Sequence, residues 1–158
     1  MSKFYFTTFL AVFASFVNPQ TLSDDCLECM CYEPQNFKER IFQASSDGCV
    51  MPDPVCTDGE MGEVCGPFAI TRIYWMEAGW FGGEFHNCVE DWQCNEDTVR
   101  GYLAKFVTDA NATCEDFART HVGGPHGPHT DATLPYWHEV QTCLDNSTFT
   151  VYPEEDLD

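Results

Sequence analysis

The stretch Cys26-Leu27-Glu28-Cys29-Met30-Cys31 places three cysteines within six residues and decides what kind of fold the chain can adopt. Ten cysteines occur among the 158 residues, an even number that can pair completely. Cys26 and Cys29 are one helical turn apart, so they can share one face of a short helix. Cysteines at this density in a chain with an N-terminal leader indicate a disulfide framework formed in an oxidising compartment.

The segment before these cysteines has the pattern of such a leader. Lys3 supplies a positive start, an apolar run extends from Phe4 to Phe13, and the small residue Ala14 follows. The apolar run is too short to span a bilayer as a helix. We therefore expect residues 1–20 to be a signal peptide, cleaved between Ala14 and Gln20, and the protein to be secreted and extracellular. A retained anchor helix is the alternative.

Acidic residues dominate the charge of the chain. Asp and Glu number 26 and Lys and Arg number 7, which gives a net charge of −19. A field of this sign repels nucleic acid and anionic membranes, so we expect neither as a partner. It also repels the anionic wall of a bacterium, so contact with a cell must depend on short-range binding.

Three stretches after the cysteine block have helical periodicity, with apolar residues at spacings of three and four. Thr113 can cap the second helix and Gly123 and Gly124 can end it. Thr133 can cap the third, with Pro135 in its first turn. The apolar positions of the three are Val99, Tyr102, Leu103 and Phe106; Cys114, Phe117, Ala118 and His121; and Trp137, Val140 and Leu144.

The rest of the chain has weaker signals. Residues 35–45 can form a short helix. The composition from Asp47 to Gly66 predicts a loop held by disulfide bridges, with a small hairpin. We expect the folded domain to cover residues 24–145, and residues 146–158 to form an acidic, disordered tail. The patterns Asn111-Ala112-Thr113 and Asn146-Ser147-Thr148 make Asn111 and Asn146 candidate glycosylation sites.

Six blocks of sequence, in this order and spacing, resemble the invertebrate-type lysozyme (destabilase) family. The resemblance extends from Cys26 to Cys143 and leaves out only the tail. The blocks are Cys26 to Cys31, Cys65-Gly66-Pro67-Phe68-Ala69-Ile70, Tyr74-Trp75-Met76-Glu77-Ala78-Gly79, Cys114-Glu115-Asp116-Phe117-Ala118-Arg119-Thr120-His121, Gly123-Gly124-Pro125-His126-Gly127 and Thr133-Leu134-Pro135-Tyr136-Trp137.

The resemblance implies a mostly α, α+β lysozyme-like fold: a small disulfide-rich domain with a short β element beside a sugar cleft. It also implies how the cysteines pair, which spacing alone leaves open. The implied pairs are Cys26–Cys114, Cys29–Cys143, Cys31–Cys49, Cys56–Cys65 and Cys88–Cys94.

The family's two catalytic carboxylates are both displaced in this sequence. Glycoside hydrolysis needs one protonated acid and one ionised carboxylate across the scissile bond. At the acid's position, three residues past Cys31, stands Pro34, so the acid is either relocated to Glu33, Asp47 or Glu39, or absent. At the second position, three residues past Cys56, stands Gly59.

Acids flank that second position. Asp58 is one place early and Glu60 one place late, and in so acidic a chain both can also be ordinary surface residues. If the protein is active, we expect Glu33 to be the acid and Asp58 the nucleophile or stabiliser.

Aromatic residues can still bind sugar rings. Trp75, Trp80, Tyr136 and His121 are the candidates for substrate binding, although for Trp75 filling the core is the preferred interpretation. Two family amides that could bind sugar hydroxyls are replaced by Ala69 and Val122.

Two other chemistries have little support. Some family members are reported to cleave isopeptide bonds, but no serine here matches the proposed nucleophile. His121, His126 and His129 lie close in sequence, yet zinc needs three or four well-placed ligands, and we expect neither a metal nor a cofactor.

The sequence therefore favours a secreted lysozyme-type glycoside hydrolase that cleaves peptidoglycan or a related amino-sugar polymer. Because both carboxylate positions are altered, this interpretation includes an enzyme whose activity is reduced. The alternative is a non-catalytic carbohydrate-binding or structural secreted protein on the same scaffold.

Overall fold

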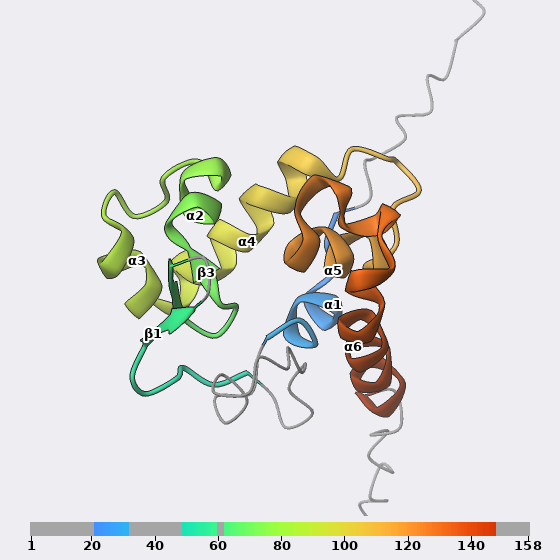
Figure 1. Cartoon of the computed structure of the whole chain (residues 1–158), viewed down its shortest axis with the longest axis horizontal. Helices are drawn as coiled ribbons and strands as arrows, with labels where there is room; N and C mark the ends of the chain where they lie inside the picture. The colour runs from blue at the N-terminus through green and yellow to red at the C-terminus, as the bar shows by residue number, and fades with distance from the viewer. Residues whose placement is uncertain (1–20, 32–48, 60–61, 148–158) are drawn as a thin grey trace, which may run out of the picture.

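The computed structural model describes residues 21–31, 49–59 and 62–147 (Figure 1). The expected signal peptide (1–20), Glu33, the expected helical piece at 35–45 and residues 148–158 lie outside this part. The elements are α1 (Asp24–Glu28), β1 (Cys56–Gly59), β2 (Gly62–Cys65), β3 (Ile70–Thr71), α2 (Arg72–Ala78), α3 (Phe85–Glu90), α4 (Trp92–Phe106), α5 (Cys114–Gly123), the 3-10 turns η2 (Gly124–His129) and η3 (Asp131–Thr133), and α6 (Leu134–Ser147).

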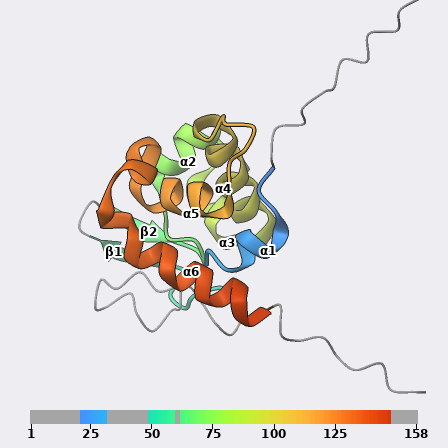
Figure 2. The same ribbon diagram turned by 90° about the vertical axis from the view of Figure 1, so that its right-hand side faces the viewer.

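Helix α4 lies between two parts of the fold. In Figure 1 the strands, α2 and α3 lie on one side of it, and α1, α5 and α6 lie on the other. Turned by 90°, α6 runs across the front of the molecule, with the strands on the far side (Figure 1 and Figure 2). The expected mostly helical lysozyme-like architecture is confirmed. No helix within the described ranges is long and apolar enough to cross a membrane.

The three strands form an antiparallel sheet in the order β1-β2-β3. Cys56 lies opposite Cys65 in the β1–β2 register, and the two are joined by a disulfide. The small hairpin expected before Gly66 is therefore confirmed, and its bridge closes the end of the hairpin away from the turn.

Helix ends follow local chemistry. The Thr113 hydroxyl and backbone both engage the Asp116 carboxylate in a capping box at the start of α5, as expected. Gly124 follows the end of α5 with a φ of +67°, a positive value that glycine adopts more easily than any other residue.

The expectation that Thr133 caps α6 does not agree with the structure. Its hydroxyl donates to the Gly127 carbonyl at 2.8 Å and accepts from the Arg119 guanidinium at 3.0 Å. Thr133 therefore fastens the 3-10 turns onto α5. Helix α6 also continues through Ser147, so the first two residues assigned to the tail, Asn146 and Ser147, are helical.

All five expected disulfides are present, and no cysteine is free. Cys26–Cys114 and Cys29–Cys143 tie the five-residue helix α1 to α5 and α6, across separations of 88 and 114 residues. A helix this short has little stability of its own, so the bridges hold it in place.

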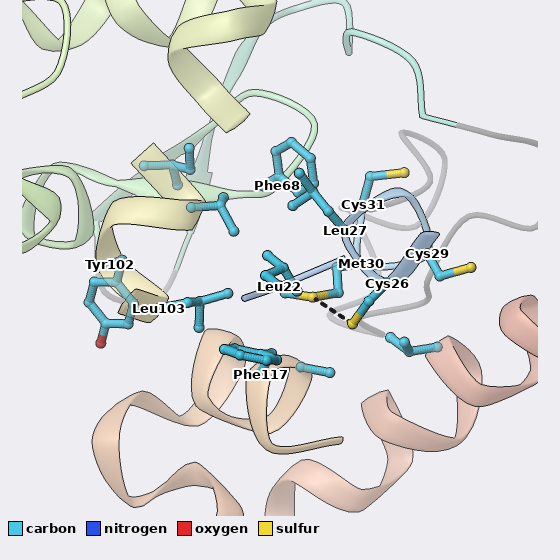
Figure 3. Packing of buried hydrophobic residues seen from close by; sticks show 14 of the residues in the cluster. Leu22, Cys26, Leu27, Cys29, Met30, Cys31, Phe68, Tyr102, Leu103 and Phe117 are labelled. Carbon is cyan, nitrogen blue, oxygen red and sulfur yellow. Dashed lines mark hydrogen bonds between the residues drawn. The ribbon is translucent and has the colours of Figure 1, made fainter. Parts of the chain in front are cut away.

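The core is built around α1. Leu27 and Met30 lie between Phe68 and the buried faces of α4 and α5, which contribute Leu103 and Phe117 (Figure 3). These side chains are almost completely buried. The packing fixes α4 and α5 against each other, and the walls of the groove described next come partly from these helices.

Candidate functional site

A groove of about 380 Å³ opens where β2, α2, α4 and the end of α5 meet. Much of its lining is apolar, with a smaller set of polar side chains among the apolar ones. The apolar residues are Val64, Phe68, Ala69, Ile73 and Val122, and the polar ones are Thr71, Tyr74, Glu77, Tyr102 and His121. Ala69 has φ +50°, a conformation that costs energy in a residue with a side chain and that is enriched at functional sites.

A larger hollow, of about 690 Å³, lies elsewhere, between residues 21–24 and helices α4 and α5. It shares no lining residue with the groove. Its guanidinium group, Arg100, is already bonded to the Leu22 carbonyl and the Asp24 carboxylate. The groove has the greater variety of polar groups and is the candidate site.

Two stacked tyrosines form part of the groove wall. The rings of Tyr74 on α2 and Tyr102 on α4 are 3.7 Å apart at an angle of 17°. The Tyr74 hydroxyl lies 2.9 Å from Nδ1 of His121, and the two rings meet edge to face. His121 therefore holds the outer end of Tyr74, while Tyr102 supports its ring.

Burial lowers the pKa of His121 to about 4, against an opposing effect from a hydrogen bond to the Phe68 backbone. The imidazole is neutral at pH 7, because desolvation penalises the charged form. A neutral, buried ring suits a positioning role better than direct contact with substrate. His121 both lines the groove and supports Tyr74, and its expected role in substrate binding stays a prediction.

Glu77 brings a carboxylate to the groove. One of its oxygens lies 2.6 Å from the Lys105 ammonium group, and both side chains are about half exposed. Burial, with the negative charge of Glu77 as a smaller cause, raises the pKa of Tyr102. Tyr102 therefore stays protonated in the physiological range and keeps a hydroxyl donor.

The β1–β2 hairpin decides which residues face the groove. Val64 lines it and pairs with Thr57, whereas Asp58 pairs with Glu63 on the other face. Successive residues of a strand point to opposite faces, so Asp58 is directed away from the groove. A Cβ atom on Gly59 would lie 2.9 Å from the Gly62 carbonyl oxygen and 3.3 Å from a Val64 methyl group, which places position 59 on the same face of the hairpin as Val64.

Comparisons with known proteins identify the family of the chain. A family model described as Destabilase matches residues 23–143. The lysozyme of Ostrea edulis is 35% identical over 130 residues, covering 80% of this chain and 85% of that protein. The chain belongs to the destabilase family.

Other relatives of this family agree. The invertebrate-type lysozyme of Ruditapes philippinarum is 33% identical over 126 residues, covering 78% of this chain and 82% of that protein. The crystal structure of Tapes japonica lysozyme superposes with a TM-score of 0.60 at 31% identity, covering 78% of this chain and 93% of that one. The expected lysozyme-type, glycosidase function is confirmed at the level of the family.

The structure describes one of the two positions where the destabilase family carries its carboxylates. Gly59, at the second position, lies on the same face of the hairpin as the groove residue Val64 and carries no acid. Asp58, the expected substitute, is exposed on the opposite face, where its neighbour Glu63 lies 3.7 Å from His86 of α3. Alternation along the strand explains the disagreement. Glu33, Asp47, Glu39 and Glu60 lie outside the described residues, so Glu33 as the acid stays a prediction.

Two of the expected sugar-binding aromatics belong to the core of this destabilase domain. Trp75 is buried, and its indole nitrogen donates to the Phe81 carbonyl at 2.7 Å. Tyr136 is also buried, and its hydroxyl donates to the Met30 carbonyl at 2.5 Å. Both polar tips are satisfied internally, so neither ring is available to substrate. Trp80 alone among the expected aromatics is well exposed.

One group of potential metal ligands occurs within the described residues: Cys56, Glu63 and His86. The Cys56 sulfur is in a disulfide with Cys65, so only a carboxylate and an imidazole remain. Two ligands are too few for a structural zinc site.

Sequence reasoning did not single out Tyr74, Tyr102 or Glu77 as site residues. Tyr102 fits the apolar side of a helix, and in the structure it also lines the groove. Tyr102 stacks on Tyr74, which lies 28 residues earlier in the chain on another helix. Local spacing in the sequence does not predict this contact.

Proposed function

We propose that the protein is a secreted lysozyme-type glycoside hydrolase acting on peptidoglycan or a related amino-sugar polymer, with weak activity at neutral pH. Membership of the destabilase family and the groove support the substrate class. The low activity rests on one observation: Gly59 occupies the groove face of β1 at the family's second carboxylate position, and Asp58 points the other way.

Two carboxyl groups are needed for efficient hydrolysis, one protonated and one ionised. Glu77 is the carboxylate that lines the groove within the described residues, and it is already paired with Lys105. That ion pair suits binding or charge stabilisation and not proton donation. Glu33 as the acid and Asp58 as the second carboxylate stay predictions to be tested. Because Asp58 points away from the groove, we expect it to contribute little, since a displacement of about an ångström can itself cost about a hundredfold in rate.

The test is clearing of a bacterial wall suspension from pH 4 to pH 8, measured as turbidity. We expect weak clearing at pH 7 and faster clearing at acidic pH, where the acid is protonated and repulsion between the protein and the wall falls. Glu33→Gln should abolish the residual activity. Brisk clearing by the unchanged protein at pH 7 contradicts the proposal.

Two matched variants test the hairpin. Gly59→Asp places a carboxylate on the Val64 face once the Gly62 carbonyl shifts slightly, and we expect it to raise the rate above that of the unchanged protein. Asp58→Asn removes a carboxylate of the same hairpin from the opposite face. If Asp58→Asn abolishes clearing and Gly59→Asp adds none, the orientation argument fails and Asp58 is the second carboxylate.

The same observation favours a second candidate, a non-catalytic protein that binds carbohydrate in the groove. Such a protein sediments with insoluble peptidoglycan but releases no reducing ends at any pH. Measuring both quantities on one sample separates a binder from a slow enzyme.

A further inference from the structure

Glu77 is the one charged side chain that lines the groove within the described residues. The histidine of the lining, His121, is neutral at pH 7, because burial lowers its pKa to about 4. The remaining lining residues carry apolar side chains, hydroxyl groups or no side chain. A charged group that a ligand brings into the groove therefore meets the Glu77 carboxylate.

The Glu77 carboxylate is engaged through one of its two oxygens. Oε2 lies 2.6 Å from the Lys105 ammonium nitrogen, whereas Oε1 has no hydrogen-bond or ionic partner in the part of the chain that the structure describes. Both side chains are about half exposed, and exposed ion pairs of this kind stabilise a protein little. A ligand can therefore compete with Lys105 for the carboxylate.

Lys105 has other contacts that it can keep when it leaves the carboxylate. Its ammonium group donates to the main-chain carbonyl of Glu77 at 3.2 Å and lies 5.0 Å from the centre of the Phe106 ring. Lys105 itself is not one of the residues that line the groove. The lysine thus neutralises Glu77 from outside the groove and leaves the inner side open to a ligand.

The hydroxyl group of Tyr102 is a second unused polar group in the groove. Tyr102 is only 7% exposed, and its hydroxyl has no hydrogen-bond partner among the residues that the structure describes. Burial, and after it the negative charge of Glu77, raises the pKa of Tyr102, so the two groups lie within electrostatic reach of each other. A Cβ atom on Gly124, another groove residue, would lie 3.7 Å from the Tyr102 hydroxyl oxygen, so no side chain covers the hydroxyl from that side. A largely buried hydroxyl without a partner favours a ligand that supplies one.

We infer that Glu77 and Tyr102 form a subsite for a primary ammonium group, carried by an unacetylated unit of an amino-sugar chain in the groove. The amino-sugar part of this inference rests on the proposed function. An ammonium group has three N–H donors and a positive charge, which suits a site made of a carboxylate and a hydroxyl oxygen. An N-acetylated unit has one N–H donor and no charge, and its acetyl oxygen is an acceptor, like the carboxylate that it would face.

The charge of the whole protein favours the same ligand. A net charge of −19 attracts a chain that carries ammonium groups and raises its rate of association. The same field repels an anionic polymer and has no such effect on a neutral one. Among amino-sugar chains, a cationic one therefore suits both the groove and the field around the protein.

The test uses the full chain and measures binding by calorimetry at pH 6, with the glucosamine trimer and the N-acetylglucosamine trimer as ligands. The glucosamine trimer should bind about tenfold more tightly, equivalent to about 1.4 kcal/mol. Glu77→Gln keeps the size of the side chain but removes its charge, and it should abolish this preference. Tyr102→Phe keeps the ring that stacks on Tyr74 and should weaken binding of the glucosamine trimer about threefold.

Two further variants separate a local site from a general effect of charge. Lys105→Met removes the competing ammonium group and should tighten binding of the glucosamine trimer, whereas a merely structural role of the ion pair predicts that Lys105→Met and Glu77→Gln both weaken it. Glu139→Gln removes an exposed carboxylate of α6 that is not in the groove lining. It changes the net charge as much as Glu77→Gln does and should leave the preference intact.

Absence of binding, or equal affinity for the two trimers, overturns the inference. A preference that survives Glu77→Gln, or that Glu139→Gln reduces by the same factor, also overturns it. If a lysine-containing tripeptide binds more tightly than the glucosamine trimer and loses its affinity in Glu77→Gln, the ammonium group comes from a peptide and the assignment to a sugar is wrong.

Failure of this inference differs from failure of the proposed function. If the preference depends on Glu77 but neither wall nor oligomer is hydrolysed, the subsite stands and the proposed enzymatic function fails. If walls are hydrolysed and Glu77→Gln leaves the relative affinity for the two trimers unchanged, the function stands and the subsite fails.

Discussion

Lowering the pH should destabilise the protein through His121. Its folded pKa is about 4, below the ordinary value of 6.5, because the ring is buried. Between these two values the unfolded chain binds the proton and the folded protein does not, so stability is lost as the pH falls. Each pH unit of this window costs about 1.4 kcal/mol, and the whole window costs about 3 kcal/mol of unfolding free energy.

The assay is urea unfolding with the disulfides intact, followed by tryptophan fluorescence at several values from pH 7.5 to pH 4. Protonation of the many carboxylates also changes stability in this range, so the informative quantity is the difference from a variant. His121→Gln removes the titrating ring and loses the bond to Tyr74, which should cost about 1–2 kcal/mol at pH 7.

The stability gap between the unchanged protein and His121→Gln should narrow or reverse as the pH falls towards 4. His129→Gln, which removes an exposed histidine of η2, is the matched control and should show a gap that does not vary in this way. A His121→Gln gap of the same size at pH 7 and pH 4.5 would refute the argument that the buried imidazole is neutral.

Three further outcomes are expected. Tyr136→Phe should lower the unfolding free energy by about 1–3 kcal/mol, because the Met30 carbonyl loses its donor in the core; an unchanged urea midpoint would show that bond to be unimportant. Gly127→Ala should cost more than about 3 kcal/mol or prevent secretion, since its Cβ would lie 1.8 Å from the Arg119 carbonyl, and near-normal melting would contradict this contact. Asn111, exposed in the loop before α5, should carry a glycan in secreted material, and an intact mass that does not fall after N-glycanase treatment would count against it.

The sequence alone determined most of the framework. The helical periodicity around Val99 and around Phe117 predicts α4 and α5, because burying one face of a helix requires that spacing. Resemblance to the family, and not spacing, supplied the disulfide pairs, since any set of ten cysteines can pair in many ways. Glycine after α5 and the Thr113 cap are equally local signals, and both were confirmed.

Tertiary structure decided which residues reach the groove. Asp58 and Gly59 are neighbours in sequence, yet the register of β1 with β2 sends them to opposite faces, and the packing of Val64 identifies the groove face. Trp75 and Trp80 are both plausible sugar platforms from composition, but only the packing of α2 buries one and exposes the other. The pKa of His121 likewise depends on burial produced by distant elements. Local sequence specifies periodicity, caps and turns, whereas the direction and solvation of a side chain depend on which elements pack around it.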